Sequence, residues 1–339
     1  MKSKEEKVKA VVYGLAYGDS FSSYSATHRM SLVAPKRILR MRGLAEFADE
    51  HLQTTRPSPY THAQPGYLLN PAPSDDSEWF AFTALAHLNS NVPIETAWTE
   101  LAHIRDQIRG RTGTKIALRN IDQGSSIEHA GHDNPHYFDD IACIRAIAAG
   151  ILSSGSVNGA TALAFSDARI THSEDGLWCA LATAALVSSG LSGETKREAV
   201  SQAMNQLPVG SWSRRIVEKA INEVAHDASA ISRGIKLEAT CVDRIYSYAI
   251  SAPESLGLLF AHLLNSSSAQ EFFLATLLHK RNLDSLPALA GAIASLFFQD
   301  QWIPESYLNS ELVLDGACRP NLKGLNLREL SEQLASASK

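Results

Sequence analysis

Alanine and leucine recur at spacings of three and four residues through most of this 339-residue chain, and this periodicity constrains its fold most strongly. Such spacing places apolar side chains on one face of an α-helix, whereas a half-buried strand alternates strictly. The lone Asn-Gly pair lies in an alanine-rich stretch, so it does not indicate a hairpin. We therefore predict an all-α protein. The pattern is clearest in Ala97–Ile108, Ile144–Leu163, Leu177–Leu186, Ile216–Val224, Leu256–Leu264, Glu271–Leu278 and Leu286–Phe298.

Capping residues and prolines mark where several helices begin, and no composition shift marks a domain boundary. Thr195, Ser251 and Pro304 each precede or open an apolar stretch, as N-cap or first-turn residues do. We predict one compact domain over residues 1–339. Two irregular stretches are expected, Thr54–Ser77 and Asp122–Tyr137, and loops of that length often carry function.

Composition excludes several classes of protein. A hydrophobic content of 45% supports a large core and argues against disorder. A net charge of −5 gives no field for holding a nucleic-acid backbone, so stable nucleic-acid binding is not expected. Four scattered cysteines suit a reducing compartment, and the mixed-charge N-terminus resembles neither a signal peptide nor a membrane span. The expectation is a cytoplasmic protein that does not bind membranes.

The run Ser74-Asp75-Asp76-Ser77-Glu78 precedes an apolar stretch and has two interpretations. Asp75 with Glu78 three residues later resembles a capping box, and acidic side chains favour a helix N-terminus. Adjacent carboxylates and hydroxyls are also the hard oxygen ligands that Mg²⁺ or Mn²⁺ prefers. Taken alone, the run favours capping.

A second oxygen-rich run, Asn282-Leu283-Asp284-Ser285, opens the Leu286–Phe298 stretch. Its polar residues could be simple caps, or they could complete an octahedral oxygen cage with the first run. Two further segments are ambiguous in the same way. Gly14 to Asp19 favours close helix packing with Asp19 as a cap, and His172 by default is a hydrogen-bonded structural histidine.

Taken together and in order, these four segments resemble the motifs of the ADP-ribosylglycohydrolase family. The family's G-x-x-x-G-D motif matches Gly14 to Asp19, and its Ser/Thr-Asp-Asp-Ser/Thr run matches Ser74 to Ser77. Its Ile-Thr-His matches Ile170 to His172. Its last motif, an Asp-Thr-Asp-Thr run before an Ala-Gly-Ala-Ile-Ala helix, matches Asn282 to Ala294. The resemblance covers about residues 9–310, and it implies a single compact orthogonal helical bundle of that family's type.

The resemblance also implies a chemistry. It places two divalent cations, Mg²⁺ or Mn²⁺, where the ribose of ADP-ribose binds, and a metal-bound water would attack the anomeric carbon. Asp75 and Asp76 are the candidate catalytic carboxylates. Asp19, Arg145 and His172 become candidate substrate contacts. The candidate metal ligands are Ser74, Asp75, Asp76, Asn282, Asp284 and Ser285.

This sequence departs from the family pattern at several places. Asn282 replaces an aspartate, which weakens the second metal site, and Lys280-Arg281 replaces paired glycines. The family's Gly-Asn-Gly-x-x-Met-Arg segment has degenerated and retains only Arg145. The replacing residues are Asp139, Asp140, Ile141 and Ile144.

The stretch Asp122–Tyr137 has three interpretations. His129, His132 and His136 could share a zinc ion, but a fourth ligand is not evident, so a solvated loop is favoured. Alternatively, the stretch covers the adenosine half of a ligand, with Tyr137 or Phe138 stacking on the base. The backbone N–H groups of Gly124, Ser125 and Ser126 would then bind the diphosphate.

The leading hypothesis is a metal-dependent hydrolase that removes ADP-ribose from a protein side chain or a nucleobase. Asn282 and the segment before Arg145 motivate an alternative, a catalytically silent member that binds ADP-ribose or acts as a scaffold. A third hypothesis is an N-glycoside hydrolase of a small metabolite.

Overall fold

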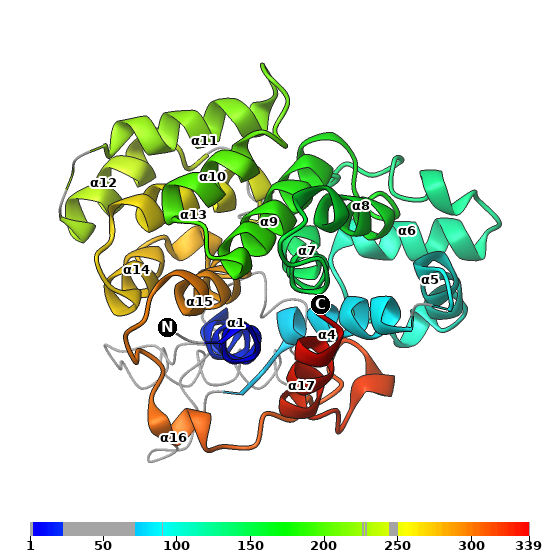
Figure 1. Cartoon of the computed structure of the whole chain (residues 1–339). Coiled ribbons are helices and arrows are strands. Elements are labelled where there is room, and N and C mark those ends of the chain that lie inside the picture. Colours follow the sequence, from blue (N-terminus) through cyan, green and yellow to red (C-terminus); the bar gives the residue numbers. More distant parts are fainter. Residues whose placement is uncertain are drawn as a thin grey trace, which may run out of the picture.

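The computed structural model describes residues 3–22, 72–89, 91–225, 227, 229–243 and 250–338. Within these ranges the chain forms fifteen α-helices and no β-strand (Figure 1), which confirms the predicted all-α class. The helices are α1 (Lys4–Asp19), α4 (Asp75–Leu88), α5 (Ile94–His103), α6 (Thr112–Asp122), α7 (Ile141–Leu152), α8 (Val157–Ala168), α9 (Glu174–Ser192), α10 (Lys196–Met204), α11 (Trp212–Glu223), α12 (Ala230–Thr240), α13 (Ala252–Asn265), α14 (Ala269–Thr276), α15 (Leu286–Phe297), α16 (Glu305–Leu308) and α17 (Leu327–Ala337). Four short 3₁₀ helices accompany them: η2 (Arg105–Gln107), η3 (Ile127–His129), η4 (Lys280–Asn282) and η5 (Pro320–Leu322).

Each apolar stretch read from the sequence overlaps a helix, but Ile144–Leu163 spans two. The chain breaks at Gly155, whose φ of +85° is left-handed, and the Ser156 side chain then caps α8 by accepting from the Gly159 N–H. Asp122 is still the last residue of α6, but residues 123–137 are irregular apart from η3, as expected. Most of Thr54–Ser77 lies outside the described residues. The prediction that its last residues form a loop is wrong, because α4 begins at Asp75.

Helices α1 and α15 cross at very short range, and glycine makes this possible. A Cβ added at Gly14 would lie 2.2 Å from the Gly291 carbonyl oxygen, and one at Gly18 would lie 2.0 Å from that of Pro287. Any larger residue would force the helices apart. The packing interpretation of Gly14 to Asp19 is therefore confirmed, and its consequence is to hold Asp19 close to the start of α15.

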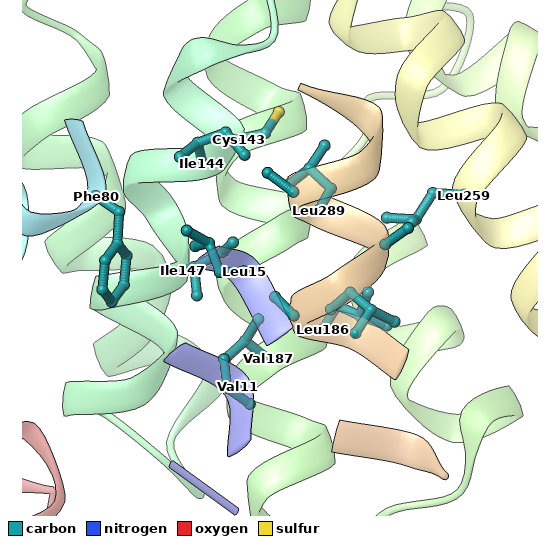
Figure 2. Close-up of a cluster of buried hydrophobic side chains, with 14 of the residues drawn as sticks. Val11, Leu15, Phe80, Cys143, Ile144, Ile147, Leu186, Val187, Leu259 and Leu289 are labelled. Atoms are coloured by element: carbon teal, nitrogen blue, oxygen red, sulfur yellow. The ribbon is translucent and has the colours of Figure 1, made fainter. Parts of the chain in front are cut away.

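The core is built from aliphatic side chains of many helices around this pair. Figure 2 shows Val11 and Leu15 of α1 near Ile147 of α7, with Leu289 of α15 and Phe80 of α4 around them. All five are less than 1% exposed. The buried apolar faces therefore fix how α1, α4, α7 and α15 sit relative to one another.

Within the described residues, no helix has both the length and the apolar character needed to cross a bilayer.

Candidate active site

Arg111 lies at the centre of a buried acidic cluster. Its side chain is almost fully buried, and its Nη1 donates to an Asp140 carboxylate oxygen. Nη2 lies 2.9 Å from Asp284 Oδ2 and also donates to the Ser285 hydroxyl. The guanidinium therefore ties together residues up to 174 positions apart in the sequence. It lies within 4.0 Å of four carboxylates: Asp76, Asp139, Asp140 and Asp284.

The cluster forms because four helices begin there. Ser74, Arg111, Asp140 and Ser285 are the N-cap residues of α4, α6, α7 and α15, respectively. Carboxylates are stabilised at helix N-termini by the N–H groups and the macrodipole. An arginine at such a position is disfavoured by the same field, so Arg111 depends on the surrounding carboxylates for its stability.

Asp19 caps α4 from another helix. Its Oδ2 accepts from the backbone N–H of Ser74 at 2.6 Å and of Ser77 at 3.0 Å, and from the Ser77 hydroxyl at 2.7 Å. The capping box suggested by Asp75 and Glu78 is therefore wrong. Glu78 instead accepts three backbone N–H groups from residues 317–319, the last at 2.8 Å. Asp19 therefore caps the start of α4, and Asp75 and Asp76 lie in its first turn.

Asp75 and Asp76 lie in the first turn of α4 and differ in exposure. Asp75 is 6% exposed, whereas Asp76 is fully buried and accepts from the Ser285 hydroxyl at 2.9 Å. Burial raises the pKa of Asp76 well above its ordinary value, and the charges of Asp75 and Asp19 raise it further. Arg111 only partly offsets this rise. Asp76 therefore holds a proton more readily than an exposed aspartate does.

A buried chain of hydrogen bonds holds Asp139 on the other side of Arg111. His172 Nε2 lies 3.0 Å from Asp139 Oδ1, and its Nδ1 lies 2.7 Å from the Thr171 hydroxyl. Arg145 reaches the same hydroxyl at 2.6 Å and binds Asp167 at 2.7 Å. His172 and Arg145 therefore lie behind the cluster, where they position Asp139.

The two adjacent carboxylates at the start of α7 respond differently to burial. For Asp139, burial alone would raise the pKa, but the charge and hydrogen bond of His172 together with Arg111 lower it to about 2. For Asp140, burial prevails, and its pKa is raised although Arg111 and the Ser255 hydroxyl favour the charged form. The pair thus combines one strongly ionised carboxylate with one of higher proton affinity.

Asn282 is buried but is directed to another carboxylate. Its Nδ2 donates to Glu254 Oε2 at 3.3 Å. An aspartate at this position would place a second carboxylate against Glu254, which explains the amide. Lys280 is exposed and Arg281 is half-buried near Glu254, so the positive charge at the cluster comes from Arg111.

The metal ions implied by the resemblance do not fit this arrangement of donors. Asp284 and Ser285 already bind the Arg111 guanidinium, whose charge would repel a divalent ion at the same oxygens. In the described part of the chain, no group of three His, Cys, Asp or Glu side chains is arranged to hold a metal. Bound Mg²⁺ or Mn²⁺ therefore stays a prediction, and it requires Arg111 to move.

The segment expected to bind a diphosphate lies away from the cluster. Gly124, Ser125 and Ser126 are exposed beyond the C-terminal end of α6, whereas Arg111 precedes its first residue. Eleven helical residues separate the two ends by about 16 Å. Their role in binding a diphosphate stays a prediction, and the structure does not place these residues at the acidic site.

The aromatic and histidine side chains of the same stretch are also dispersed. Tyr137 is half-buried with its ring 5.2 Å from that of Phe138. His129 and His132 are exposed with ring centroids 5.1 Å apart, while His136 is buried and stacked on Phe138. The favoured solvated-loop interpretation agrees with the exposure of the first two histidines, whereas His136 belongs to the interior.

Sequence reasoning missed three members of the cluster: Arg111, Asp139 and Asp140. The last two were interpreted as degeneration of a family segment, although two acidic residues before an apolar helix repeat the pattern of Asp75 and Asp76. That repetition was a usable signal. For Arg111 the only local sign was its place between Gly110 and Gly113 at the start of an amphipathic helix.

Comparison with known proteins agrees with this fold. The model of the ADP-ribosylglycohydrolase family matches residues 1–338, so the chain belongs to that family. A solved structure titled "ADP-ribosylglycohydrolase-related protein complex" is similar over 100% of both chains, with a TM-score of 0.64 and 17% sequence identity. At that identity the likeness shows the shared fold alone. No curated protein matches the sequence.

Proposed function

We propose that this chain cleaves the glycosidic bond between ADP-ribose and an acceptor, and that the ribose binds at the cluster around Arg111. The acceptor is a protein side chain or a nucleobase. Family membership supports the reaction class. The observation that carries the location is the meeting of carboxylates from α4, α7 and the start of α15 around one guanidinium.

Carboxylates suit this reaction for two reasons. Cleavage passes through an oxocarbenium-like centre, and ionised Asp or Glu side chains stabilise its developing positive charge. A neighbouring carboxylate also accepts the proton of the attacking water. We assign these roles to Asp75 and Asp76. Asp75 is the more exposed of the two, and both lie at the helix start that Asp19 holds in place.

Arg111 supplies the positive charge of the site in this proposal. By binding Asp140, Asp284 and Ser285, it keeps three helix starts together without a metal. Its remaining donors are suited to oxygen atoms of a ribose or a phosphate. The Mg²⁺ or Mn²⁺ implied by the family resemblance would be held by Ser74, Asp75, Asp76, Asp284 and Ser285 only after Arg111 had left these oxygens.

A second candidate function is binding of ADP-ribose without cleavage. The specific observation in its favour is the neutralisation of Asp284 by Arg111, because a carboxylate already engaged in an ion pair is a weaker base and a weaker ligand. The scaffold and small-metabolite hypotheses have no such observation behind them.

The experiment that tests the proposed function measures ADP-ribose release from arginine-linked, serine-linked and nucleobase-linked conjugates. Each is assayed with Mg²⁺, with Mn²⁺ and with EDTA. The variants are D75A/D76A and the control D106A, whose side chain is 93% exposed. We expect release by the wild type and the control, and a loss of at least about 100-fold in the double variant.

Calorimetry with ADP-ribose separates the two candidates. Turnover of one conjugate class supports the hydrolase. Binding of ADP-ribose that depends on the cluster, with no release from any conjugate, would establish the second candidate in its place. Neither binding nor release would contradict both.

A further inference from the structure

A second buried arginine lines a pocket that the acidic site does not use. The pocket has a volume of about 440 Å³ and lies between the C-terminal half of α4, helix α5 and residues 319–322. Volumes of this size hold small organic ligands. Its walls are largely apolar, and the residues that matter here are Phe82, Leu85, Ala97, Leu101, Leu322 and Arg319.

Arg319 is the unusual member of this wall. Its side chain is 3% exposed, and its guanidinium carbon lies 4.0 Å from the Phe82 ring centroid and 5.3 Å from that of Trp79. The buried Nε and Nη1 atoms form no hydrogen bond to any residue of the described ranges. Among the described residues, its surroundings are therefore aromatic rings and the pocket, and no carboxylate there is bound to it.

The nearest acidic partner is already engaged. Glu78 accepts the backbone N–H groups of Ala317, Cys318 and Arg319 at 2.7, 2.9 and 2.8 Å. Its charge helps Arg319 only at longer range. Burial lowers the pKa of Arg319 to about 10 in spite of Glu78. A cation buried without a hydrogen-bonded counter-ion is costly, and stacking on aromatic rings offsets only a part of that cost.

The rest of the lining restricts the ligand. Glu100 lies on the pocket wall with Asn89 and Asn321, and all three are exposed. The Glu100 carboxylate on the wall would repel a second negative charge on the ligand, so a dianion is disfavoured. The apolar wall favours a hydrocarbon or aromatic body.

We propose that this pocket binds a small apolar carboxylate, with its anionic head on the Arg319 guanidinium and its body against the walls formed by α4 and α5. The site is separate from the acidic cluster. Phe82 follows Asp75 by seven residues on α4, which places it about 10 Å further along the helix axis. The ligand supplies the counter-ion that Arg319 lacks among the described residues.

The test compares octanoate with octanamide by calorimetry on the full chain. The two probes have the same body, and only octanoate carries a charge. We expect saturable binding of octanoate, about tenfold or more tighter than that of octanamide. R319M should reduce octanoate affinity to that of octanamide and leave octanamide unchanged. R214Q, which removes an exposed ion pair with Glu218, is the matched control and should bind like the wild type.

A97F fills the pocket from α5 and keeps Arg319, so it should abolish binding of both probes. This variant and the comparison of probes on the wild type decide the matter even if R319M fails to fold by circular dichroism. The proposal is overturned if octanoate does not bind, if both probes bind equally well, or if A97F binds them like the wild type. None of these outcomes depends on ADP-ribose release.

Discussion

Arg111 and Arg319 are both less than 8% exposed, yet the chain surrounds them in opposite ways. Arg111 has four carboxylates within 4.0 Å, and Arg319 has two aromatic rings and a pocket. Their pKa values shift in opposite directions. For Arg111, burial is outweighed by its carboxylates and the pKa is raised, whereas burial lowers the pKa of Arg319 to about 10.

The difference shows that burial by itself does not define the role of a charged residue. The carboxylates that pair with Arg111 lie inside the fold. Arg111 is therefore part of the structure that brings four helix starts together. Within the described residues, Arg319 has no hydrogen-bonded counter-ion. This property is expected of a group that binds a ligand.

The largest effect should come from removing the cation of the acidic cluster. R111M leaves four buried carboxylates without their ion pairs, so we expect a loss of about 3–5 kcal/mol in the free energy of unfolding at neutral pH. Urea unfolding measures this loss. A loss below about 1 kcal/mol would contradict the account, because the carboxylates would then have another source of compensation.

A smaller, pH-dependent effect should arise from Asp139. Its pKa is about 2 in the folded protein against an ordinary 3.8, so the ionised form stabilises the fold above about pH 4. That contribution, about 2 kcal/mol, is lost as the pH falls from 3.8 through 2. Urea unfolding of the wild type and D139N should therefore differ at pH 7 and converge near pH 2.

A difference between the wild type and D139N that stays constant over this range would contradict the role of His172 and Arg111 in holding Asp139 ionised. R319M serves as the comparison. Since Glu78 acts on Arg319 only at longer range, the difference between R319M and the wild type should vary much less over the same range of pH than the difference for D139N.

The smallest effect should come from removing Arg319 itself. R319M removes the stacking on Phe82 and Trp79, which stabilises the fold by up to about 2 kcal/mol. It also removes a buried unpaired cation, which destabilises the fold. The two nearly cancel, so we expect the stability of the ligand-free protein to change by no more than about 1 kcal/mol. A loss above about 2 kcal/mol would show that Arg319 is structural in the same sense as Arg111.

These contrasts also explain which parts of the molecule the sequence could predict. The helices follow from local apolar periodicity, and the Gly14–Gly18 spacing correctly indicated close helix packing. The structure also brings Asp76, Asp284 and Ser285 together, as the ordered motifs implied. Such features depend on spacing within one segment or on a pattern shared by a family.

Arg111 could not be predicted in the same way. Its partners lie 29 positions away at Asp140 and 174 away at Ser285, and the glycines at 110 and 113 do not by themselves distinguish it from a surface arginine. In the sequence, Asp139 and Asp140 resemble a degenerate motif, because their role depends on the Arg111 cation beside them in the structure. The prediction for Gly124 to Ser126 depended on a loop geometry that the sequence does not encode locally.

The most direct test of the central claim, that Arg111 is the resident cation of the acidic site, is a calorimetric titration with Mn²⁺ of the wild type and R111S. With Arg111 in place, we expect no saturable Mn²⁺ site at the cluster in the wild type and the same melting temperature in Mg²⁺ and in EDTA. In R111S, where Asp284 and Ser285 are released, we expect a new Mn²⁺ site that D75A/D76A removes, with a melting temperature that rises with metal concentration. Saturable binding of Mn²⁺ at the cluster of the wild type, undiminished by the presence of Arg111, would contradict this claim.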